Sequence, residues 1–187
     1  MNVKKVVLIV VVVLSLFTIP ASAASNVGFN GIGGRLFYED FEGSSAIGVG
    51  AVVKLAEFNT NLQFEGNVDL WSKTYDVGLF EAKLRDLIIG GTVKYYFTTS
   101  SPMLKPFVNG GLALHLLNSE GETAEITIGD VTVGGSYSES STKVGFDLGG
   151  GVAYALNPTT DLVANIMYRI VSDTNQLFIG VGFLISL

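Results

Sequence analysis

His115 is the only histidine in the chain of 187 residues, so any mechanism that needs an imidazole base must use it. Such a base also needs a nucleophile within hydrogen-bond reach. Leu117 occupies the position two residues away, and Ser119 and Glu120 fall in a predicted loop. We therefore interpret His115 as a structural residue, and we predict no catalytic residue and no enzymatic activity.

Acidic residues gather in the stretch 118–130, which could suggest a calcium site. Their spacing matches no compact loop of oxygen ligands such as the EF-hand, so we predict no metal site. The glycines alternate along predicted strands instead of preceding a helix, so they form no phosphate-binding loop and we expect no cofactor. The chain has no cysteine, which excludes disulfides and thiol catalysis. The acidic residues of this stretch are Glu120, Glu122, Glu125 and Asp130.

A second set of charged residues lies on the polar faces of predicted strands. Alternate residues of a strand share a face, and five bases and five acids fall on the same face as many glycines and alanines. A narrow interior favours small residues, and it needs balanced charges because a buried unpaired charge is very costly. We therefore predict a charge network in the lumen of a barrel, made of Arg35, Glu39, Lys54, Glu65, Asp69, Asp86, Lys94, Lys143, Asp147 and Arg169.

The strands that carry these residues are predicted from apolar side chains that recur with a period of two. Between Asn61 and Trp71, for example, every second residue is apolar or glycine. Mean hydropathy is +0.47 and only 15% of the residues are charged, against about a quarter in soluble domains, which indicates an apolar environment. We predict an all-β fold, an eight-stranded antiparallel up-and-down transmembrane β-barrel, with strands near 28–39, 44–57, 61–72, 82–97, 105–117, 142–156, 160–171 and 175–187.

The connections between these strands alternate in length. Short turns at 58–60, 98–104 and 157–159 alternate with segments that are longer on average, at 40–44, 72–81, 118–141 and 172–175. Short turns at one rim and longer loops at the other are typical of an up-and-down membrane barrel. Within the longest loop, residues 125–128 and 131–133 flank Gly129-Asp130, so we predict a small hairpin ribbon above the rim.

The N-terminal residues predict export. Lys4 and Lys5 precede an apolar run at 6–19, and Ala21-Ser22-Ala23 follows as a cleavage site. We predict a cleaved signal peptide at 1–23 and an outer-membrane β-barrel domain at 24–187. Removing the signal leaves nine bases against 17 acids, so we expect no nucleic-acid partner.

Three segments carry a resemblance to a known family: residues 105–114 (KPFVNGGLAL), residues 145–169 ending in Tyr168-Arg169, and the closing strand to Leu187. The chain resembles the small outer-membrane β-barrels of the OmpA/OmpX-like family. The resemblance implies location in the outer membrane of a Gram-negative cell, contact with membrane lipid and lipopolysaccharide, insertion by the barrel-assembly machinery, and a monomer. It also implies an assembly signal at Phe183, Ile185 and Leu187, although family members usually end in an aromatic residue.

An eight-stranded barrel has an interior only just wide enough for side chains, and large charged residues are predicted inside this one. We therefore predict a plugged lumen and a structural or surface-interaction role carried by the extracellular loops, whose ligand the sequence does not name. The first alternative is a small porin-like channel for small solutes. The second is a lipid A-modifying enzyme, a class that also uses eight-stranded barrels.

Overall fold

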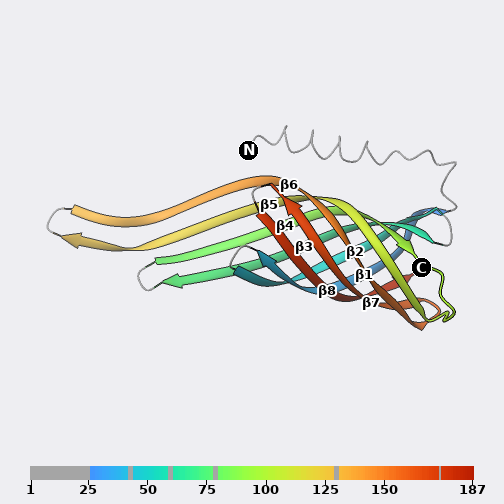
Figure 1. The fold of residues 1–187 in the computed structure, drawn as a ribbon. Coiled ribbons are helices and arrows are strands. Elements are labelled where there is room, and N and C mark those ends of the chain that lie inside the picture. The colour runs from blue at the N-terminus through green and yellow to red at the C-terminus, as the bar shows by residue number, and fades with distance from the viewer. Residues whose placement is uncertain (1–25, 42–43, 59–60, 78–79, 129–130, 173) are drawn as a thin grey trace.

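The computed structural model describes residues 26–41, 44–58, 61–77, 80–128, 131–172 and 174–187, so the predicted signal peptide lies outside the described residues. These residues form a closed barrel in which each strand pairs antiparallel with its neighbours in the chain and the first closes on the last (Figure 1). The predicted eight-stranded up-and-down barrel is confirmed. Its strands are β1 (Asn26–Phe41), β2 (Ser44–Glu57), β3 (Leu62–Val77), β4 (Phe80–Tyr96), β5 (Leu104–Ile128), β6 (Val131–Asn157), β7 (Thr160–Val171) and β8 (Thr174–Ser186).

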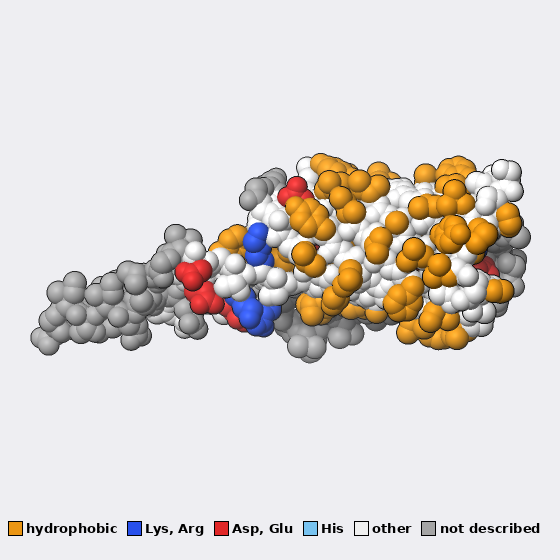
Figure 2. Space-filling view, turned by 90° about the horizontal axis from the view of Figure 1, so that it is seen from below, with side chains coloured by type: hydrophobic (Ala, Val, Ile, Leu, Met, Phe, Trp, Pro, Cys, Tyr) orange, Lys and Arg blue, Asp and Glu red, His pale blue; other side chains and the backbone are white. Residues whose placement is uncertain are grey.

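The outer surface of the barrel is apolar. Large side chains such as Leu36, Ile47 and Phe146 are more than half exposed on the outward face of their strands. Figure 2 shows such side chains spread along the cylinder. A water-soluble protein rarely exposes so large an apolar surface, whereas the hydrocarbon core of a bilayer matches it. In the described part of the chain, no helix is long and apolar enough to span a membrane.

The strands are longer than predicted at one rim. The ladder between β5 and β6 continues past the pair Glu120↔Ser138 and ends at Ile128↔Val131. The ladder between β3 and β4 ends at Val77↔Phe80. The predicted loops 72–81 and 118–141 are therefore mostly continuations of barrel strands. The reason is that apolar alternation ends where the bilayer ends, whereas backbone pairing continues into water. The predicted hairpin forms the tip of this continuation.

The extra length lies on one side of the barrel. Beyond Gly48, β1 and β2 continue for four more pairs and end at Phe41↔Ser44. Beyond the pairs Gly48↔Trp71 and Gly145↔Val171, β3, β4, β5 and β6 continue further, each paired with the next. We call residues 72–77, 80–85, 118–123 and 135–140 the extension sheet. Beyond the pair Phe80↔Thr123, β5 and β6 continue alone as a two-stranded ribbon, which projects far from the barrel in Figure 1. Longer connections are extracellular in such barrels, so this rim is the outer one.

Candidate functional site

Arg169 of β7 is the centre of the lumen. Its guanidinium is fully buried and donates from Nη1 to Oε1 of Glu39 at 2.8 Å. Its other nitrogens lie 3.4 Å from carboxylate oxygens of Asp69 and Asp147. Asp69 also accepts a bidentate pair from Arg35, with 2.8 Å from Nε and 2.5 Å from Nη2. Residues from β1, β3, β6 and β7 thus meet across the barrel axis.

An aromatic ring fills the space beside this cluster. Phe178 of β8 is fully buried, and the guanidinium carbons of Arg35 and Arg169 lie 5.0 and 4.5 Å from its ring centroid. Phe37 stacks on the same ring with centroids 4.9 Å apart. Cation–π contacts of this kind gain strength where water is excluded. The ion pairs and the rings therefore form one packed layer.

Asp86 and His115 form a separate buried pair in the part of the lumen nearer the outer rim. Nδ1 of His115 lies 2.7 Å from Oδ2 of Asp86, and neither side chain is exposed. Nε2 of His115 has no hydrogen-bond partner among the described residues and packs over Gly145, where an added Cβ would lie 3.0 Å away. Parity places both residues inward, but their diagonal pairing across β4 and β5 was not predicted.

A third group lies towards the inner rim. Nζ of Lys94 contacts both carboxylate oxygens of Glu65 at 2.8 and 2.7 Å, and Gln63 donates to the same carboxylate. Lys54 contacts Glu57 at 3.0 Å and donates to Ser186 at 2.9 Å. Glu57 was absent from the predicted network. Among the described contacts, predicted charged residues thus gather around Arg169, in the Asp86–His115 pair and near the inner rim.

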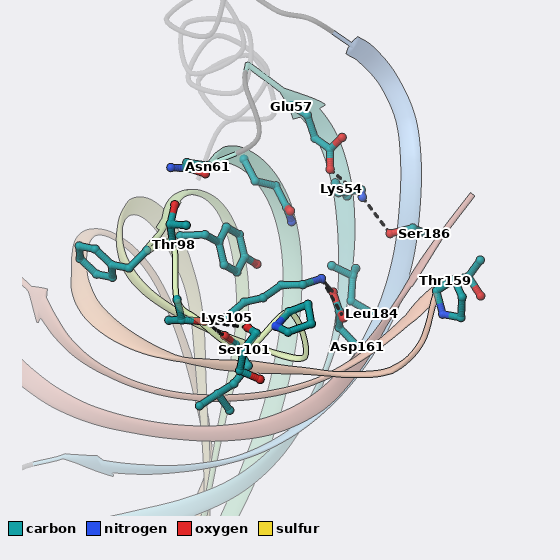
Figure 3. Close-up of a pocket in the computed structure, with 17 residues that line it drawn as sticks. Lys54, Glu57, Asn61, Thr98, Ser101, Lys105, Thr159, Asp161, Leu184 and Ser186 are labelled. Atoms are coloured by element: carbon teal, nitrogen blue, oxygen red, sulfur yellow. Dashed lines mark hydrogen bonds and ion pairs between the residues drawn. The ribbon is translucent and has the colours of Figure 1, made fainter.

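Hollows open at both rims. The inner vestibule, about 340 Å³, is polar and contains the pairs Lys54–Glu57 and Lys105–Asp161 (Figure 3). The outer vestibule is about 470 Å³. The two share no lining residue, and a cavity of about 30 Å³ beside Arg35 and Lys94 lies between them. The outer vestibule is lined by Phe41, Trp71, Leu84, Leu117, Ser119, Glu139, Ser141, Lys143, Val171, Thr174 and Gln176.

The acidic side chains that the structure describes in the lumen and at the rims do not form a cation site. No group of three or more histidine or acidic side chains in the described ranges is arranged to hold a metal ion. Buried carboxylates of the lumen face arginine or histidine instead, as in Asp69–Arg35 and Asp86–His115.

Comparison with known proteins assigns the family. The model of the outer membrane protein beta-barrel domain family matches residues 9–185. The chain belongs to this family. It is therefore an outer-membrane β-barrel protein, as the resemblance implied, and its neighbours are barrels of the same class.

Solved structures of this class share the fold at low sequence identity. Ail, the attachment invasion locus protein of Yersinia pestis, is 14% identical with a TM-score of 0.56, over 84% of this chain and 95% of that one. Neisserial surface protein A is 20% identical with a TM-score of 0.54, over 87% and 100%. OprG from Pseudomonas aeruginosa is 13% identical with a TM-score of 0.52, over 87% and 97%. No curated protein sequence matches this chain.

The residues proposed as the assembly signal of this family barrel lie on its outer face. Phe183, Ile185 and Leu187 occupy alternate positions at the end of the chain and are 51%, 37% and 76% exposed. The backbone N–H of Leu187 donates to the carbonyl oxygen of Asn30 at 3.0 Å, so the last residue is still tied to β1.

Changing Leu187 to Asp is expected to leave most of the protein unassembled in the periplasm, because the change puts a carboxylate into this apolar row. The measurement is the fraction of outer-membrane protein whose gel mobility changes on boiling. Leu187→Phe is the control and should assemble at least as well as the parent. Equal assembly of Leu187→Asp and the parent would contradict a role for these three residues in assembly.

Proposed function

We propose that this barrel serves as a surface-interaction protein, with a lumen closed by its side chains and a working surface formed by the β5–β6 ribbon. The closed lumen is supported chiefly by Arg169, whose contacts with Glu39, Asp69 and Asp147 join three other strands through the barrel centre. A solute passing between the vestibules would have to separate these ion pairs, which is costly in a buried site.

The ribbon supports the surface role because of its reach. Residues of β5 beyond Asn118 extend about 3.4 Å each, so the strand runs roughly 34 Å further to its end at Ile128. A barrel that only filled the membrane would gain nothing from so long a pair of strands. Such a projection carries its side chains past the lipid headgroups, where a partner outside the cell can meet them.

The net negative charge of the projecting strands restricts the charge of a binding partner. Residues 72–85 and 118–143 contain seven acids against four bases. A structure of the neighbour Ail contains sucrose octasulfate, a heparin analogue, but at 14% identity the likeness extends to the fold alone. We propose that the ribbon of this chain contacts a neutral or basic surface, because a sulfated polymer would be repelled by its acids.

Shortening the ribbon tests this role. Replacing residues 123–135 with Asn-Gly closes β5 on β6 at the pair Glu122↔Ser136 with a two-residue turn. Gram-negative bacteria that express the full chain should adhere to a fixed epithelial monolayer. Bacteria that express the shortened variant should adhere no better than the same strain without the barrel. Boiled and unboiled samples should show that the variant still folds.

The matched control shortens the other hairpin. Replacing residues 76–81 with Asn-Gly closes β3 on β4 at the pair Tyr75↔Ala82 and leaves the ribbon intact. Adhesion should persist in this variant. Adhesion that survives ribbon shortening, or that the full chain never confers, would refute the proposed role of the ribbon.

A small channel is the second candidate, favoured by the two vestibules that enter the lumen from opposite rims. Recording from planar bilayers separates the two candidates. A closed lumen predicts no steady conductance above the baseline, and a steady open level would support the channel. We propose no catalysis by Asp86 and His115, because Nε2 of the histidine packs over Gly145 and not against a hydroxyl.

A further inference from the structure

The outer vestibule ends on buried, mostly apolar side chains. Among its lining residues, Trp71, Val171 and Gln176 are 2%, 5% and 5% exposed. Phe41 stacks on Trp71 with ring centroids 5.0 Å apart, and Phe41 and Leu84 both pack against the buried apolar cluster that contains Trp71. The inner vestibule, by contrast, contains two ion pairs. The outer vestibule therefore presents an apolar surface to a molecule that enters it.

Two polar atoms of this lining have no hydrogen-bond partner among the described residues. They are Nε1 of Trp71, which can only donate, and Oε1 of Gln176, which can only accept. Both residues adjoin Phe41, because Trp71 stacks on its ring and Gln176 is its partner in the ladder between β1 and β8. An unpaired buried group has lost its hydration without replacement, so such groups are rare in proteins. A ligand of the vestibule that offers one acceptor and one donor would satisfy both atoms.

The inward face of the extension sheet leads from the outer medium to this vestibule. On β4, Phe80, Ala82 and Leu84 occupy alternate inward positions, and Leu84 also lines the vestibule. The ring of Phe80 stacks with that of Tyr137 at a centroid distance of 6.5 Å. Tyr137 lies over Gly121, where an added Cβ would overlap its ring. These residues form an apolar wall that rises beyond the rim on one side, so a dissolved molecule can reach the vestibule along it.

Size and charge restrict the ligand to a small neutral molecule. The vestibule holds about 470 Å³, within the range of roughly 300–1,000 Å³ that is usual for small-molecule sites. Such sites are lined mostly by apolar side chains and carry a few polar groups that orient the ligand. The charged residues of the described lining are Glu139 and Lys143, one of each sign on the same face of β6, so a net charge on the ligand gains little.

We propose that the outer vestibule binds a small, neutral, mainly apolar molecule that carries an amide group. The amide oxygen accepts from Nε1 of Trp71 and the amide nitrogen donates to Oε1 of Gln176, while the apolar body packs on the ring of Phe41. The apolar body gains by leaving water, whereas water in the same place would meet mostly carbon. The ligand comes from outside the cell, because the vestibule opens at the outer rim.

Equilibrium dialysis of the folded barrel in lipid nanodiscs tests the proposal with probes of similar size. The amide probe 3-phenylpropanamide accepts and donates, the matching methyl ester only accepts, and butylbenzene does neither. Gln176→Leu should weaken binding of the amide about five-fold, the effect of one hydrogen bond of ordinary strength, and leave the ester unchanged. Trp71→Phe keeps an aromatic ring but removes the donor, so it should weaken the amide and the ester by similar factors and leave butylbenzene unchanged.

A matched pair of variants tests whether the probes bind in the vestibule. Ser141→Phe puts a ring among the lining residues and should abolish saturable binding of every probe. Ser138→Phe adds the same ring to the outward face of β6 and should leave binding unchanged. In the parent, saturation by the amide should also change the fluorescence of Trp71, which is the single tryptophan and lies in the site.

The results that would overturn the site differ from those that would overturn the amide. Saturable binding that persists in Ser141→Phe, or an amide that neither saturates nor changes the fluorescence of Trp71, would overturn the site. Equal losses of the amide and butylbenzene in Trp71→Phe, or of the amide and the ester in Gln176→Leu, would overturn the amide as the recognised group. Gln176→Leu decides alone if Trp71→Phe does not fold. Because no described lining residue falls within 123–135, the barrel with the shortened ribbon should keep this binding, so failure here is distinguishable from failure of the surface role.

Discussion

Changing Arg169 to Met should lower the free energy of unfolding of the barrel by about 3–5 kcal/mol, the cost of leaving buried charges without their partner. The guanidinium is fully buried against Glu39, Asp69 and Asp147, and it also covers the ring of Phe178. Methionine restores much of the volume but none of the charge. Urea unfolding in lipid vesicles measures this loss of stability. The signal is the fluorescence of Trp71, the single tryptophan, which is buried in the lumen of the folded barrel.

The matched control for this prediction removes an exposed base. Nζ of Lys105 lies 3.3 Å from Asp161 at the inner rim, and its side chain is 44% exposed. Lys105→Met should cost less than about 1 kcal/mol, as exposed ion pairs do. Adding Glu39→Gln to Arg169→Met should recover part of the loss, because one uncompensated carboxylate is then neutral. Similar costs for Arg169→Met and Lys105→Met would contradict a central role for the buried cluster.

The sequence could predict which side chains face the lumen, but not which of these side chains form ion pairs with one another. The pleat repeats every two residues, so parity alone assigns Arg169, Asp69 and Glu39 to one side of the sheet. Which of them meet depends on the stagger of strands that are not neighbours in the chain. Arg169 and Asp69 are 100 residues apart and approach each other only after the barrel closes. No periodic pattern in the sequence predicts that these two side chains meet.

Aromatic residues near the rims are a further sequence prediction, and it is only partly correct because the sequence does not mark where the bilayer ends along a strand. The sequence places Tyr75 and Phe80 in an outer ring of interfacial aromatics, beside Tyr38 and Tyr168, with a second ring at the inner rim. Tyr38 and Tyr168 do point outward, but Tyr75 lies on the inner parity and shares a hydrogen bond with Ser44. Phe80 also lies on the inward face, and its ring centroid is 6.5 Å from that of Tyr137. Above the membrane, aromatic residues can pack on either face of a sheet.

Closure of the barrel depends on glycines that face inward at the seam between β1 and β8. An added Cβ at Gly33 would lie 2.1 Å from the carbonyl oxygen of Phe183, and one at Gly182 would lie 2.3 Å from that of Gly34. The opposing atoms belong to the backbone, so no side-chain rotation can relieve the overlap. A small barrel curves strongly, which brings neighbouring strands this close on their concave side.

Gly33→Ala is therefore expected to destabilise the barrel by about 3 kcal/mol or more, at or above the upper end of overpacking costs. Gly34→Ala is the matched control, because its added Cβ would lie 3.5 Å from the ring of Phe183, an ordinary contact. Alanine restricts the unfolded chain more than glycine does, so Gly34→Ala should be neutral or slightly stabilising. Urea midpoints and the folded fraction on unboiled gels compare the two. If Gly33→Ala kept the parent's midpoint, the β1–β8 seam could admit a methyl group at little cost, and close backbone approach at the seam would not be what requires glycine.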